Sequence, residues 1–109
     1  MREFKSGATR DDENNKLDFE GFLSPIVLES FAKYMHCHRE TELGLRDSAN
    51  WQKGISKDVY IKSAWRHFHD IWMEHRGYKS REGLEDALNG VLFNVMGYLF
   101  EILSPRQKD

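Results

Sequence analysis

Residues 63–92, SAWRHFHDIWMEHRGYKSREGLEDALNGVL, decide the fold of this chain. They predict two helices that fold back on each other at residues 75–80, where Gly77 suits the position just past a helix C-terminus. At about 100° per residue, the first helix carries one continuous apolar stripe. The stripe consists of Ile61, Ala64, Trp65, Phe68, Ile71 and Trp72. A hairpin of two amphipathic helices is therefore the expected centre of the protein.

Polar side chains that can bind a cation share a second sector on each helix of this hairpin. If the helices are antiparallel, the two sectors face each other and their side chains meet in three layers. The opposed pairs are Glu74 with Glu82, Asp70 with Asp86, and His67 with Asn89. Carboxylate oxygens and imidazole nitrogens are common ligands of divalent metals. The spacing therefore predicts a metal site inside the hairpin.

A solvent-exposed charged face is the alternative interpretation of this pattern, because charged residues opposite an apolar stripe are usually hydrated. Against it, Phe93, Met96 and Phe100 continue the acidic face along the second helix. A face that is acidic at one end and aromatic at the other is unusual for plain surface. Both interpretations stay open at the level of the sequence.

The composition indicates one domain and excludes several classes of partner. The chain has 109 residues, enough for a single hydrophobic core. Its formal net charge of −2 provides no basic excess, which argues against nonspecific nucleic-acid binding. Cys37 is the single cysteine, so no internal disulfide is expected, and its side chain is expected to be buried on a helix. With no apolar run long enough for a membrane span or a signal peptide, we expect a cytoplasmic protein, in the host cytoplasm if it is phage-encoded.

Three main helices in a small all-α bundle are expected, because no segment alternates as a half-buried strand does. The first begins at Ser24-Pro25, an N-cap followed by proline at the first helical position. The second starts near residues 56–58. The third runs from about residue 81 to residue 103 and is capped by Ser80.

Less regular segments surround these helices. An N-terminal arm of residues 1–22 precedes a single domain of residues 23–104, and residues 105–109 form a tail. The connection over residues 39–57 is long for two helices, and such connections are often functional or hold a short extra turn. Within it, Trp51 is expected either to stack on a nucleotide base or to plug the end of the core.

The third helix is apolar on nearly all sides from Val91 onward, which predicts a dimer or higher oligomer built on residues 84–103. One side is expected to pack on the other helices of the same chain: Val91, Leu92, Val95, Leu99 and Ile102. The opposite side is expected to meet a second copy: Phe93, Met96 and Phe100. Gly90 and Gly97 would let the backbones approach at that seam, and the N-terminal arm is the alternative cover.

Nearly the whole chain resembles the phage-borne family called dATP/dGTP diphosphohydrolase, N-terminal domain, through the segments SGATRD, KLDFEGFLSP, NWQKG, VYIKSAWRHFHDIW and GLEDALNGVLFNVMGYL. The hairpin is in turn similar to the all-α nucleotide pyrophosphohydrolases of the MazG type. Those enzymes bind Mg²⁺ with Glu-x-x-Glu on one helix and Glu-x-x-Asp on the next, and release pyrophosphate from nucleoside triphosphates.

This chain departs from the MazG pattern at the predicted metal ligands. It carries His67-x-x-Asp70 in place of Glu-x-x-Glu, and its second helix offers Glu82-x-x-Glu85 or Glu82-x-x-x-Asp86. Imidazole suits Mn²⁺, Zn²⁺ or Fe²⁺ better than Mg²⁺. His67 is therefore expected to be a hydrogen-bonding neighbour of a carboxylate site, or a ligand of a different metal.

The resemblance implies a metal-dependent nucleotide pyrophosphohydrolase that cleaves dATP or dGTP to the monophosphate and pyrophosphate. The cation, Mg²⁺ or Mn²⁺, would be held by Asp70, Glu74, Glu82 and Asp86, with His67 beside them. Glu82 or Glu85 would orient or deprotonate the attacking water. The substrate-binding set would be Lys62 and Arg66 on the phosphates, Trp51 on the base, and Asn89.

Two other interpretations remain. One is a noncatalytic phage module that serves protein interaction or dimerisation on a MazG-like fold. The other is a resemblance to the HD phosphohydrolases through His36, His69, Asp70 and Asp86, for whose fold the chain is too short.

Overall fold

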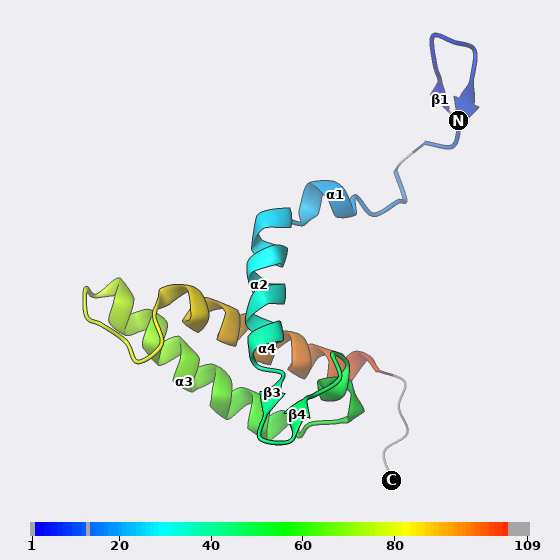
Figure 1. Ribbon diagram of the computed structural model, residues 1–109. Helices are drawn as coiled ribbons and strands as arrows, with labels where there is room; N and C mark the ends of the chain where they lie inside the picture. Colours follow the sequence, from blue (N-terminus) through cyan, green and yellow to red (C-terminus); the bar gives the residue numbers. More distant parts are fainter. Residues whose placement is uncertain (1, 13, 105–109) are drawn as a thin grey trace.

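The computed structural model describes residues 2–12 and 14–104, and it is mostly helical, as predicted. The long helices are α2 (Pro25–Cys37), α3 (Lys57–His75) and α4 (Leu84–Leu103). Figure 1 shows α3 and α4 side by side as a hairpin, with α2 crossing α4. The predicted pair of antiparallel helices is thus the centre of the molecule.

The helices α2 and α3 begin where the sequence predicted them to begin. The Ser24 hydroxyl accepts a hydrogen bond from the backbone N–H of Val27, and Pro25 takes the first helical position. The Ser56 hydroxyl accepts a hydrogen bond from the backbone N–H of Asp58 in the same way. These local signals are readable from sequence because each involves residues only two or three positions apart.

The start of α4 lies three residues later than predicted. Gly83, at φ +88°, stands directly before the helix, and no side chain caps it there. The Ser80 hydroxyl instead accepts a hydrogen bond from the Gly83 N–H at 2.9 Å and donates one to the Glu74 carboxylate. Ser80 therefore orders the turn between the two helices rather than the first turn of α4.

Two short antiparallel ribbons contradict the expectation of a chain without strands. They are β1 (Arg2–Glu3) with β2 (Thr9–Arg10), and β3 (Glu40–Thr41) with β4 (Gly44–Leu45). Ladders of two residues are too short to show alternation in the sequence. The remaining short elements are α1 (Phe19–Phe22) and the 3₁₀ helix η1 (Asn50–Lys53). The predicted extra turn in residues 39–57 is confirmed as the β3–β4 ribbon and η1.

The N-terminal arm does not lie on the helical hairpin. Figure 1 shows β1, β2 and α1 standing away from α3 and α4. Apolar side chains of this part are largely exposed, including Leu17, Phe19 and Phe22. The predicted tail, residues 105–109, lies outside the described residues. Among the described residues, no helix has the length and apolar character needed to cross a membrane.

The contact between α3 and α4 depends on two glycines of α4. The ring of Tyr60, which is 1% exposed, occupies the place where Gly97 has no side chain. The ring of His67 lies against Gly90 in the same way. The prediction that Gly90 and Gly97 form a seam with a second copy is therefore wrong, because both glycines face α3 of their own chain.

The predicted orientation of α4 is also reversed. Phe93 and Phe100 are partly buried because the Trp51 ring packs on both, at centroid distances of 6.1 and 5.0 Å. Trp51 thus plugs the end of the core, the second of its two predicted roles. Met96, predicted to face a second copy with these two rings, is also partly buried. The predicted inner side is about half exposed at Leu92, Val95, Leu99 and Ile102.

Cys37, at the end of α2, is exposed, contrary to prediction. It belongs to the wall of the hollow described below.

Candidate metal centre

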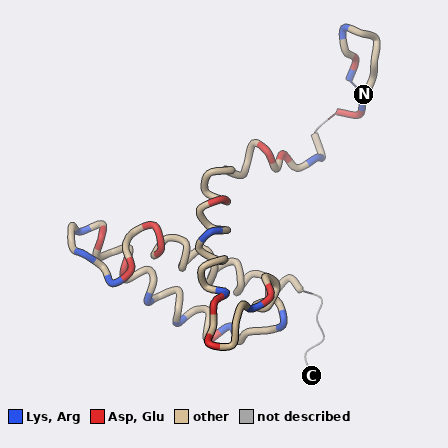
Figure 2. Tube along the Cα trace, in the orientation of Figure 1, with Lys and Arg blue, Asp and Glu red and all other residues tan. Residues whose placement is uncertain are grey.

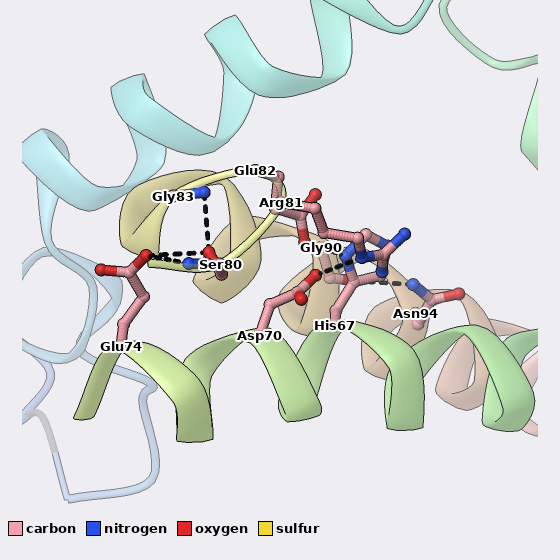
Figure 3. A network of polar contacts seen from close by, with 9 residues as sticks. All are labelled: His67, Asp70, Glu74, Ser80, Arg81, Glu82, Gly83, Gly90 and Asn94. Carbon is pink, nitrogen blue, oxygen red and sulfur yellow. Dashed lines mark hydrogen bonds and ion pairs between the residues drawn. The ribbon is translucent and has the colours of Figure 1, made fainter. Parts of the chain in front are cut away.

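Three side chains with metal-binding atoms meet where the turn between α3 and α4 approaches α3. His67 and Asp70 come from α3, and Glu82 comes from the turn just before α4. One ligand atom from each lies within 4.8 Å of the others. Asp70 is buried, and the other two are partly buried. Figure 3 shows the group with its neighbours.

The position of His67 is fixed from two sides. Its Nδ1 lies 2.6 Å from the Glu82 carboxylate, which accepts a hydrogen bond from the ring. Its ring lies on Gly90, where an added Cβ would come within 2.5 Å of the ring. Asn94, also buried, donates a hydrogen bond to the Gly90 carbonyl at 2.7 Å. The imidazole is therefore held in one orientation.

Arg81 neutralises the buried carboxylate of the group. Its Nε donates a hydrogen bond to Asp70 Oδ2 at 2.8 Å, while 60% of the Arg81 side chain stays exposed. A buried carboxylate without a cationic partner would be strongly destabilising. Arg81 thus supplies positive charge where a metal ion would supply it.

Glu74, one of the predicted metal ligands, lies outside this group. Its carboxylate accepts hydrogen bonds from the backbone N–H and the hydroxyl of Ser80, at 2.8 and 2.9 Å. The pKa of Glu74 is lowered chiefly by the backbone hydrogen bond and then by the hydroxyl, while burial and, to a smaller extent, the charge of Asp70 oppose the change. Glu74 therefore stabilises the turn.

The predicted layers of Asp86 and Asn89 are turned toward α2 instead. Asn89 donates a hydrogen bond to the Ser30 hydroxyl at 2.9 Å, and this hydroxyl donates one to Glu85 at 2.7 Å. Asp86 is exposed and is not part of the three-residue group. These residues join α2 to α4 beside the candidate site.

Tyr34 of α2 is buried within the electrostatic influence of Glu82 and Asp86. Burial, together with the smaller effect of the negative charges of Glu82 and Asp86, raises the pKa of its hydroxyl to about 12. Tyr34 therefore stays protonated and neutral beside the carboxylates at physiological pH.

The group fits a divalent cation by its donor set. Ligand atoms held about 2.0–2.6 Å from one ion lie up to roughly 5 Å apart, which accommodates the observed spread. Two carboxylates and one imidazole suit Mn²⁺ better than Mg²⁺. Binding would require the Arg81 guanidinium to leave Asp70 and the His67–Glu82 hydrogen bond to open.

A hollow of about 700 Å³ opens next to this group. His67 belongs to its wall, together with Trp51 and the basic residues Arg39 and Arg46. The Arg39 Nε donates a hydrogen bond to the Arg46 carbonyl at 2.8 Å, which holds one arginine to the β3–β4 ribbon. The predicted phosphate-binding residues Lys62 and Arg66 are exposed on α3 and do not line this hollow.

The sequence analysis did not assign a site role to Arg39, Arg46, Arg81, Tyr34 or Ser30. Except for Arg81, their positions depend on how α2 and the β3–β4 ribbon cross the hairpin, and no periodic pattern reports that crossing. The Gly90 position carried a readable signal, since glycine inside a helix often marks a close approach.

Comparison of the chain with protein-family models, with curated proteins and with solved structures finds no match.

Proposed function

We propose that this protein is a metal-dependent nucleotide pyrophosphohydrolase that cleaves purine deoxynucleoside triphosphates to the monophosphate and pyrophosphate. One observation carries the proposal: His67 belongs both to the three-residue group with Asp70 and Glu82 and to the wall of the adjacent hollow. A substrate in the hollow would therefore reach the metal-binding side chains. The substrate class comes from the resemblance of the sequence to the phage family, and the purine preference is part of the proposal.

Each residue of the group has a role in this reaction. Asp70 and Glu82 would hold the cation with His67, and the bound cation would neutralise charge on the phosphate oxygens. Once the His67–Glu82 hydrogen bond has opened for the cation, the Glu82 carboxylate would also orient the attacking water or accept its proton. Glu85, tied to Ser30, is the alternative carboxylate for that step.

The hollow supports the binding of an anionic substrate. Arg39 and Arg46 place two guanidinium groups on its wall, and guanidinium suits phosphate oxygens. Lys62 and Arg66 stay candidates for the outer phosphates from their exposed positions on α3. Trp51 borders the hollow, so the edge of its indole is available to a base even though its ring packs on Phe93.

Pyrophosphate release from the four dNTPs and four NTPs, with Mg²⁺ and with Mn²⁺, tests the proposal. Asp70→Asn and Glu82→Gln are expected to lower the rate at least tenfold, while Glu29→Gln, the same change in an exposed ion pair with Lys33, leaves it unchanged. Asp86→Asn distinguishes the ligands predicted from the sequence, which include Asp86, from the observed group, which does not. This variant lowers the rate only if Asp86 joins the site in the substrate complex. No release from any nucleotide with either metal would refute the hydrolase.

The competing function is a noncatalytic module for protein interaction. The specific observation in its favour is the set of large apolar side chains on α3 and α4 that are about half exposed. A chain that binds a protein partner but releases no pyrophosphate from any nucleotide would establish this second function.

A further inference from the structure

The helical hairpin has an apolar surface that no described part of the chain covers. On α3 it consists of Ile61, Trp65, Phe68 and Trp72, and on α4 of Leu84, Leu88, Leu92, Val95, Leu99 and Ile102. We call these ten residues the hairpin face. Their exposed fractions run from 44% at Leu92 to 69% at Trp65. In Figure 2 the length of α4 between Asp86 and Glu101 carries no charged residue, so no charge interrupts this face from Leu88 to Leu99.

The hairpin face is separate from the surfaces that hold the chain together. Tyr60 and His67 pack on Gly97 and Gly90, which lie on the side of α4 that meets α3. The α2 helix meets α4 through Ser30 and Asn89, on another side. The face therefore remains available after α2, α3 and α4 have packed.

The spacing of the face is that of a helical bundle. Its residues recur at intervals of three and four along both helices, which is the period by which helices bury a shared seam in bundles and coiled coils. Ile61, Trp65 and Phe68 also surround a hollow of about 230 Å³ between the helices, bordered by Val91 of α4. A hollow of this kind accepts a protruding apolar side chain from a facing helix.

The size of the face matches what a stable pair of copies needs. An aromatic side chain buries about 150–250 Å² and an aliphatic one somewhat less, so ten such side chains at half exposure offer roughly 700–1,000 Å². A standard interface covers about 800 Å² on each partner, whereas the largest patch of a typical monomer is about 300–600 Å². We infer that a second copy of this chain covers the hairpin face, hairpin against hairpin, in a two-fold four-helix bundle.

A second copy is the occupant that the geometry favours over a foreign protein. A two-fold interface uses one self-complementary surface twice, and a pair of straight helices with a common seam satisfies that requirement. The inference is independent of the proposed hydrolysis, because it concerns neither the metal group nor the adjacent hollow.

Sedimentation equilibrium of the full chain at micromolar concentration, without nucleotide or metal, tests this inference. The expected mass is twice 12.9 kDa. Trp65→Glu and Val95→Glu, each on the face, are expected to return the mass to that of one chain. Leu43→Glu is the matched control, because Leu43 is 99% exposed at the end of the β3–β4 ribbon and should leave the dimer intact.

Two further measurements keep the outcome decisive. Circular dichroism shows whether the face variants stay helical. If they unfold, dilution of the parent protein is the deciding experiment. The fluorescence of Trp65 and Trp72 should then shift to the red as the two copies separate. A parent protein that sediments as one chain overturns the inference. A dimer that persists in both face variants also overturns it. The same holds if Phe19→Glu and Phe22→Glu in the arm convert the dimer to single chains while the face variants remain dimeric.

Discussion

The imidazole of His67 lies directly on Gly90, 23 residues later in the chain, and a Cβ at Gly90 would come within 2.5 Å of the His67 ring. The same ring is hydrogen-bonded to Glu82 at 2.6 Å. A single missing side chain on α4 therefore sets the position of the candidate metal ligand on α3. This relationship makes the site sensitive to a change that touches no ligand.

Gly90→Ala is expected to displace His67 and weaken its hydrogen bond to Glu82. Overpacking of this kind costs about 1–3 kcal/mol in the free energy of unfolding. Mn²⁺ affinity, measured by isothermal titration calorimetry, should fall with it. Gly97→Ala is the matched control, because it crowds Tyr60 and lowers stability similarly but leaves the metal group in place. Equal loss of Mn²⁺ affinity in both variants would contradict the assigned role of Gly90.

Arg81→Gln is expected to strengthen Mn²⁺ binding severalfold while destabilising the metal-free protein. The guanidinium occupies Asp70 Oδ2 at 2.8 Å, so its removal frees the carboxylate and leaves it buried without a cationic partner. The thermal midpoint of the variant should therefore fall below that of the parent and recover when Mn²⁺ is added. A variant that Mn²⁺ does not stabilise would show that Asp70 is not a ligand.

The hydrogen bonds from Ser80 to Glu74 are expected to make stability sensitive to acid. Because they lower the pKa of Glu74 in the folded protein, their contribution is present above the ordinary pKa of a glutamate and is lost as the pH falls through the lowered value. Thermal midpoints measured from about pH 6 downward should drop more steeply for the parent than for Glu74→Gln. Ser80→Ala, which keeps the backbone donor, should give an intermediate slope. Parallel curves for all three proteins would rule out this role.

Tyr34 is expected to make stability sensitive to alkali. Burial raises its pKa to about 12 in the folded protein, whereas an unfolded tyrosine ionises near 10. The folded state thus keeps a proton that the unfolded chain loses, so stability falls as the pH rises from about 10 toward 12. Denaturant titrations should show a smaller fall for Tyr34→Phe. An identical fall in both proteins would mean that Tyr34 ionises equally in the two states.

The sequence by itself determined the hairpin and almost its register. The cap at Ser24, the helix start near residues 56–58 and the helix end before Gly77 depend on neighbouring residues, and all three hold in the structure. The predicted partner of His67 was Asn89, and its observed neighbour is the next residue, Gly90. A helical period gives the direction of each side chain around its own axis, which is enough to bring the two helices together.

Only the tertiary structure decided which side chains form the site and which face of α4 is covered. Glu82 reaches His67 because the turn before α4 is irregular and ends at Gly83, so no helical spacing applies to it. Phe93 is covered because the long connection brings Trp51 onto it. Periodicity orients a residue around its own helix, but the segment that comes to lie against it depends on the path of the rest of the chain.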